Sequence, residues 1–131
     1  MKKSTLLNHR LSDVIARIGH TQALVVGDAG LPIPYHVERI DLAVSPGVPG
    51  VMDVLKAIAS EMQVEAIVVA DELLARDATL AEAVCALFPG APLTSVPHIE
   101  FKERSERAIA VVRTAECTPY ANFMLISGVT Y

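Results

Sequence analysis

The stretch ALVVGDAGLPIP, residues 23–34, decides the fold. Its first five residues, Ala23 to Gly27, form an apolar run of strand length, and the remainder is rich in the Gly, Pro and Asp typical of turns. A strand that is apolar at every position is buried on both faces, so helices must cover both sides of its sheet. Asp28 directly follows this strand, where a polar side chain can face a ligand.

Helical and strand patterns alternate on both sides of this stretch. A helix is predicted to end at Gly19, because apolar residues recur before it at helical spacing: Leu11, Val14, Ile15 and Ile18. Later patterns predict helices at 51–62 and 79–88, a helical turn at 100–107, and strands at 39–44, 66–70, 93–96, 108–113 and 122–127. We predict one domain over residues 1–131, an α/β fold of three layers around a largely parallel sheet, with a Rossmann-like topology.

Composition excludes several classes of function. The chain has 131 residues, of which 52% are hydrophobic and 5% aromatic, and its net charge is −4 without any basic run. Nucleic-acid binding is therefore disfavoured. The apolar runs are far shorter than the roughly 20 residues that cross a bilayer, and Cys85 and Cys117 show no disulfide-scaffold spacing. We expect a soluble, cytoplasmic protein without membrane insertion, and its high apolar content favours self-association.

The motifs that hold phosphates, metals and activated nucleophiles are missing. No GxGxxG follows the first predicted strand, so the dinucleotide fingerprint of a Rossmann fold is absent, and no GxxxxGK[ST], HExxH, CxxC or GxSxG occurs. Convergence of His20, Asp28 and His98 on a metal is the minor interpretation. Acid/base chemistry or plain binding of a small polar ligand remains, and we expect no cofactor and no metal.

Five polar positions have both a functional and a purely structural interpretation. His20, just after the predicted helix stop, is either a cation at the helix end or an acid/base group. Asp28 either caps its turn or stands beside His20 as a carboxylate that orients the imidazole. His98 is either a surface histidine or a ligand group. Tyr120 and Asn122 suit the hydroxyl groups of a neutral polyol, or else belong to a simple turn.

Four short motifs occur in order along the chain: Gly19-His20-Thr21, Asp28-Ala29-Gly30-Leu31-Pro32, Arg39-Ile40-Asp41 and Thr118-Pro119-Tyr120-Ala121-Asn122. Together they resemble the D-ribose pyranase family, over nearly the whole chain. Ala115 stands where a glycine is common in that family, and the segment 80–96 matches poorly; both departures lie outside the matched site residues and concern local loops.

The resemblance implies an enzyme that interconverts the pyranose and furanose forms of free D-ribose. It implies His20 as the catalytic proton donor and a sugar site formed by other residues: Asp28, His98, Tyr120, Ala121, Asn122 and, as a weaker match, Lys102. It also implies a homodecamer of two pentameric rings, with sites between neighbouring subunits. Ring opening needs a base at the anomeric hydroxyl and an acid at the ring oxygen, and we expect Asp28 to orient His20 for that task. The alternatives are a mutarotase for fucose or another aldose, and a non-catalytic sugar-binding partner of a transport system.

Overall fold

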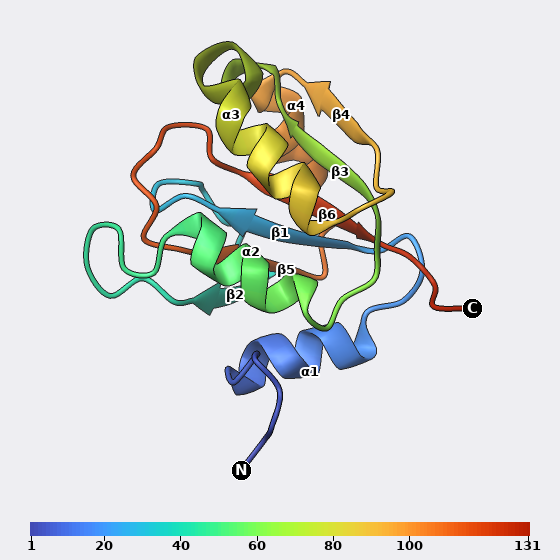
Figure 1. Ribbon diagram of the computed structural model, residues 1–131. Helices are drawn as coiled ribbons and strands as arrows, with labels where there is room; N and C mark the ends of the chain where they lie inside the picture. Colours follow the sequence, from blue (N-terminus) through green and yellow to red (C-terminus); the bar gives the residue numbers. More distant parts are fainter.

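The computed structural model describes residues 1–131, with four helices and six strands. The helices are α1 (His9–Arg17), α2 (Val51–Ala59), α3 (Asp71–Leu87) and α4 (His98–Ser105). The strands are β1 (Ala23–Gly27), β2 (Glu38–Asp41), β3 (Val64–Ala70), β4 (Leu93–Val96), β5 (Ala110–Arg113) and β6 (Phe123–Ser127). All six strands belong to one sheet, in the order β2-β5-β1-β6-β3-β4 (Figure 1).

Five strands run in one direction and β6 runs against them. β1 pairs in parallel with β5, β5 with β2, and β3 with β4, whereas β6 lies antiparallel between β1 and β3. In Figure 1 the arrowheads of β1 and β6 point in opposite directions. The predicted three-layer α/β class with a largely parallel sheet is confirmed. The strand order, however, is not the Rossmann order 3-2-1-4-5-6, because the last strand inserts between β1 and β3.

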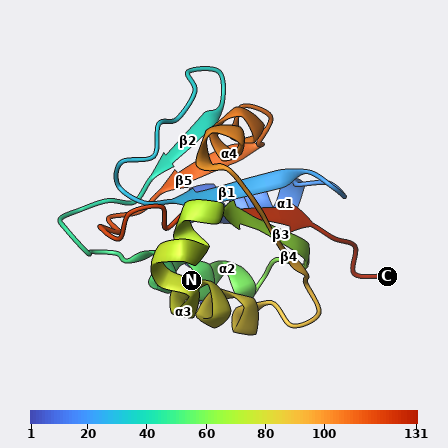
Figure 2. The same cartoon turned by 90° about the horizontal axis from the view of Figure 1, so that it is seen from above.

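Helices cover both faces of the sheet. Leu24 and Val26 of β1 belong to a large core cluster with buried residues of α1, α2 and α3, whereas Val25 belongs to a second cluster with Phe101 of α4. Figure 2 shows α2 and α3 on one side of the sheet and α4 on the other. Side chains of a strand alternate between faces, so β1 contributes to both clusters and is buried from Leu24 to Gly27, as its apolar run predicts.

The largest difference from the predicted elements is in α3. This helix begins at Asp71, directly after β3, and not near 79. The helical conformation is interrupted at Asp77, which has φ −148° and ψ 70°. The Asp77 carboxylate accepts a hydrogen bond of 3.0 Å from the Leu80 N–H. Asp77 thus caps the second half of α3, which corresponds to the helix predicted at 79–88. No helix is both long enough and apolar enough to cross a bilayer.

Candidate active site

A hollow of about 450 Å³ lies at the edge of the sheet where β1 ends and β6 begins. Val26 lies opposite Phe123 in the antiparallel ladder, so the residues that follow β1 and those that precede β6 meet at this edge. Four predicted site residues line the hollow: Asp28, His98, Tyr120 and Asn122. The structure thus brings these four polar side chains to one place.

Asp28 and Asn122 hold each other through two hydrogen bonds. The Asp28 backbone N–H donates to Asn122 Oδ1 (2.9 Å), and Asn122 Nδ2 donates to Asp28 Oδ2 (3.1 Å). The Gly30 N–H donates to the other carboxylate oxygen of Asp28 (2.9 Å). Asn122 is 1% exposed, so its amide is held in one orientation and fixes the Asp28 carboxylate at the rim of the hollow.

Gly27 is required for this arrangement because there is no space for a side chain. A Cβ at this position would lie 2.9 Å from Asn122 Oδ1 and 2.6 Å from Leu31 Cδ2. Separations under 3 Å are not found for real Cβ atoms. The glycine at the end of β1 therefore lets the Asn122 amide reach the backbone of Asp28.

His98 and Tyr120 form the second wall of the hollow. Their rings meet edge to face, with centroids 5.0 Å apart and an interplanar angle of 82°. His98 is the first residue of α4, and its backbone N–H donates to Glu72 Oε2 (2.9 Å), which fixes the helix start. The Nδ1 atom of His98 is buried and has no hydrogen-bond partner within the chain, and buried polar atoms without a partner are rare in native proteins.

Tyr120 has a strained backbone. Its φ of 64° lies in the left-handed region, which residues with a side chain seldom adopt. The Asn122 N–H donates to the Tyr120 carbonyl (2.7 Å), which closes a tight turn just before β6. Strain of this kind persists where surrounding contacts impose it, and it clusters at functional sites.

Glu116 organises the loop that forms the far rim. Its carboxylate accepts hydrogen bonds from the backbone N–H groups of Val51 (3.2 Å), Cys117 (3.0 Å) and Thr118 (3.0 Å). Partial burial acts to raise the pKa of Glu116, but these N–H donors outweigh it and leave the pKa below its usual value. Through the Val51 N–H, Glu116 also caps the first residue of α2.

The structure places two further predicted residues beside the hollow but outside its lining. Ala121 is fully buried between Tyr120 and Asn122, and only its backbone can contribute. Lys102 lies four residues after His98 on α4, on the same side of the helix, and its ammonium makes no hydrogen bond.

His20 lies at the opposite edge of the sheet. It precedes β1, whereas Asp28 follows it, and five strand residues span roughly 16 Å. Within one chain Asp28 therefore does not orient His20, and His20, Asp28 and His98 do not converge on a metal. His20 Nε2 instead contacts Glu65 Oε2 at 2.8 Å. His20 also lines a separate hollow of about 330 Å³, which is bordered by the end of β6.

Sequence reasoning missed two carboxylates that contact predicted site residues. Glu65 contacts His20, and its signal is a single charge within the otherwise apolar strand 64–70. Glu72 accepts the hydrogen bond from the His98 backbone, and its signal is only that it follows the same strand closely. Neither contact follows from local sequence, because each joins segments 26 or more residues apart.

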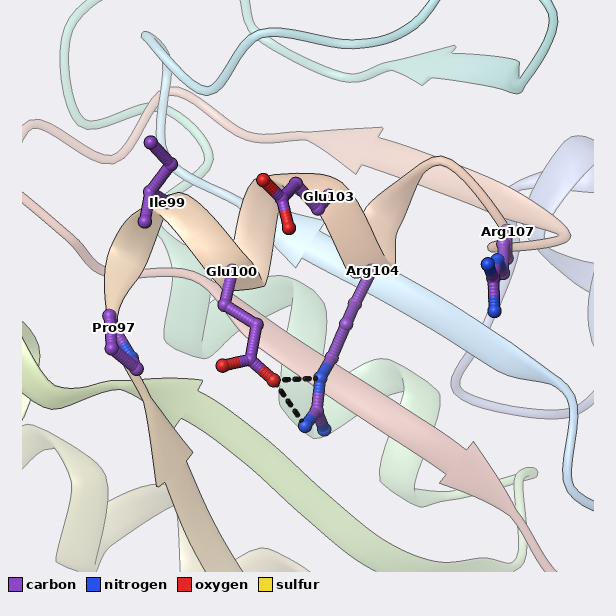
Figure 3. Close-up of a pocket in the computed structure, with 6 residues that line it drawn as sticks. All are labelled: Pro97, Ile99, Glu100, Glu103, Arg104 and Arg107. Atoms are coloured by element: carbon purple, nitrogen blue, oxygen red, sulfur yellow. Dashed lines mark hydrogen bonds and ion pairs between the residues drawn. The ribbon is translucent and has the colours of Figure 1, made fainter.

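A third hollow, of about 550 Å³, runs along α4 (Figure 3). Glu100 and Arg104 pair across it, with Arg104 Nε 3.0 Å from Glu100 Oε1. Each charge is thereby neutralised within the helix, as is common for groups four residues apart. None of the predicted site residues lines this hollow.

Comparison with known families agrees with these observations. Residues 1–130 match the model of the RbsD / FucU transport protein family. A D-ribose pyranase from Symbiobacterium thermophilum is 54% identical over 131 residues, and one from Laribacter hongkongensis is 48% identical over 131 residues. In both comparisons 100% of each chain is covered.

Solved structures match along the whole chain as well. RbsD of Bacillus subtilis, complexed with D-ribose, superposes with a TM-score of 0.94 at 41% identity, and the match covers 100% of both chains. A fucose mutarotase from Streptococcus pneumoniae, in complex with L-fucose, gives a TM-score of 0.80 at 23% identity, again over 100% of both chains. The second similarity concerns the fold alone.

Proposed function

The chain belongs to the RbsD / FucU family, and from this premise we propose that it is a D-ribose pyranase, an isomerase of carbohydrate metabolism that interconverts the pyranose and furanose forms of free ribose. The observation that carries the proposal is the hollow at the β1–β6 edge. There the Asp28–Asn122 pair meets His98 and Tyr120, in a chain that matches D-ribose pyranases along its full length.

The charge of the hollow favours a neutral sugar over a sugar phosphate. Its lining contains two carboxylates, Asp28 and Glu116, and no Lys or Arg. A phosphate group would therefore meet like charge without a cation to balance it. Carboxylate, amide and phenol groups instead match the hydroxyl groups of a sugar, each of which both donates and accepts a hydrogen bond. Free ribose is the substrate this chemistry fits.

His20 supplies the titratable group that ring opening requires. The cyclic hemiacetal opens when a base removes the proton of the anomeric hydroxyl and an acid protonates the ring oxygen as the C–O bond breaks. An imidazole exchanges protons near neutral pH and is suited to both directions of the reaction. In this assignment Asp28, His98, Tyr120 and Asn122 hold the hydroxyl groups, with Ala121 and Lys102 in supporting positions, and His20 carries the proton.

Because His20 lies at the far edge of its own sheet, the site requires His20 of a second copy. We infer a closed homo-oligomer in which the His20 edge of one subunit meets the hollow of the next. Tyr35, Val44, Ile99 and Tyr131 support such an assembly, because all four are large, apolar and more than half exposed in the single chain. The family resemblance favours two pentameric rings, a decamer, and the cytoplasm is the compartment we propose.

The two alternatives have weaker support. A mutarotase for fucose rests on a structure only 23% identical to this chain, against 41% for RbsD complexed with ribose. A sugar-binding partner without turnover rests on the transport wording of the family description. Exchange NMR of ribose with catalytic amounts of protein separates all three. A pyranase accelerates exchange between the ring forms of ribose. A fucose mutarotase instead accelerates exchange between the forms of fucose, and a binding protein accelerates neither exchange.

A further inference from the structure

We propose that Glu65 is the positioning residue of His20: its carboxylate fixes which imidazole nitrogen handles the proton. The inference rests on the assignment of His20 as the proton donor. The two side chains meet at 2.8 Å, between His20 Nε2 and Glu65 Oε2. They are 52% and 38% exposed, and an ion pair so exposed adds little to stability. The contact is therefore better suited to orienting the ring than to holding the fold.

A bulge in β3 aims Glu65 at His20. Val64 lies opposite Ser127 of β6, and Ala66 lies opposite Ile126, so β3 advances by two residues where β6 advances by one. Glu65 is the extra residue. Bulges of this kind redirect a side chain, and they are frequent beside active sites. In a strand without a bulge, the regular alternation of side chains between the two faces of the sheet would alone set the direction of the Glu65 side chain.

Neighbouring backbone features maintain the contact. Thr21, next to His20, has φ 67°, a left-handed conformation that is unusual for a β-branched residue, and its N–H donates to the Ser127 carbonyl (2.9 Å). Gly128 leaves room on the other side, because a Cβ there would lie 3.0 Å from Glu65 Cβ. The strained backbone of Thr21 and the close packing of Gly128 against Glu65 thus both occur where His20 contacts Glu65.

The hydrogen bond selects one tautomer. A carboxylate only accepts, so the neutral imidazole donates its Nε2–H to Glu65 and leaves the Nδ1 lone pair free. Nδ1 makes no hydrogen bond within the chain, so it is the nitrogen that takes up and delivers the proton. When Nδ1 is protonated, the adjacent carboxylate balances the imidazolium charge. The proton delivered to the ring oxygen matches the one lost from the anomeric hydroxyl, so the open sugar stays neutral.

The test compares Glu65→Ala and Glu65→Gln with Glu61→Gln in the full-length protein. Glu61 borders the same hollow but pairs with Lys2 at 3.0 Å and does not contact His20, so Glu61→Gln is the matched control. Exchange NMR over a range of ribose concentrations gives kcat and KM. We expect both Glu65 variants to lose about tenfold or more in kcat. Their KM should stay within about twofold of wild type, because the residues proposed to bind the sugar lie at the β1–β6 edge. Added formate should partly restore Glu65→Ala, and Glu61→Gln should match wild type.

Nitrogen NMR of the His20 ring supplies a readout that a structural role would not change. The wild-type ring should show the Nε2–H tautomer, and Glu65→Ala should show a mixture of tautomers in a protein of unchanged oligomer mass. Wild-type kcat in Glu65→Ala, an equal loss in Glu61→Gln, or an unchanged tautomer would each overturn the proposal. If wild-type protein does not accelerate exchange at all, the proposed function fails, while the tautomer comparison still decides the role of Glu65.

Discussion

His20 and Asp28 lie at opposite edges of one sheet, the first before β1 and the second after it. Each chain thus carries the Asp28 hollow at one edge and the His20–Glu65 pair at the other. A contact in which one edge meets the opposite edge of the next copy is heterologous, and it forms a ring when its rotation brings the last copy back to the first, as the closed oligomer inferred above requires. The separation of these two residues is the structural basis for expecting shared sites.

His20→Ala should lower kcat by about 10²- to 10⁴-fold, the usual contribution of a positioned proton-transfer group. Binding of ribose should persist, because the proposed sugar ligands lie at the β1–β6 edge. Exchange NMR measures the rate, and isothermal titration measures binding. His9→Ala is the matched control, since His9 is also exposed and has no role in the site. A variant with wild-type exchange would remove His20 from the mechanism.

Asn122→Asp should weaken ribose binding and destabilise the fold by about 1–3 kcal/mol. The new carboxylate would face that of Asp28 at the 3.1 Å contact where the amide now donates. Chemical denaturation gives the free energy of unfolding, and the substrate dependence of exchange gives KM. Asn8→Ala is the control, because it removes the N-cap of α1 far from the hollow and should lower stability without changing KM. Equal KM values in the two variants would contradict the role of the Asp28–Asn122 pair.

Gly27→Ala should destabilise the fold by about 1–3 kcal/mol, because the added methyl would overlap Leu31 and the Asn122 amide. KM for ribose should rise at the same time, since the amide that orients Asp28 must shift. Gly90→Ala is the comparison: nothing lies within 4 Å of its Cβ position, and its cost comes only from a φ of +86°. If Gly27→Ala lowered stability but left KM unchanged, Asn122 would not be the group that orients Asp28.

Glu116 should make stability sensitive to acid. Its pKa is lowered in the folded protein, so its contribution is fully present above the unfolded value, about 4.3, and is lost as pH falls through the lower folded value. Glu116→Gln should be less stable than wild type at pH 7, by about 1 kcal/mol or less because solvent screens the half-buried charge. Thermal midpoints measured from pH 7 to pH 3 should converge at the acid end. A constant difference across that range would show that Glu116 does not act through its charge.

The sequence predicts those parts of the molecule that depend on local pattern. The apolar run Ala23–Gly27 predicts β1 because burial on both faces leaves no alternation, and the polar residues at its end predict one wall of the hollow. The antiparallel insertion of β6 could not be predicted, because pairing partners are set by packing across the chain and not by local pattern. The bulge at Glu65 exists only through that pairing, and the start of α3 was missed because no turn residue separates it from β3.

Co-assembly of two inactive variants is the most direct test of a ribose site shared between subunits. His20→Ala lacks the proton donor, and Asp28→Asn lacks the carboxylate of the hollow, so each alone should leave the exchange of ribose between ring forms near its uncatalysed rate. Expressed together in equal amounts, they should form oligomers in which about one quarter of the sites combine a native His20 with a native Asp28 from the next copy. Exchange NMR should then show about a quarter of wild-type activity; activity no higher than that of either variant alone would contradict the account.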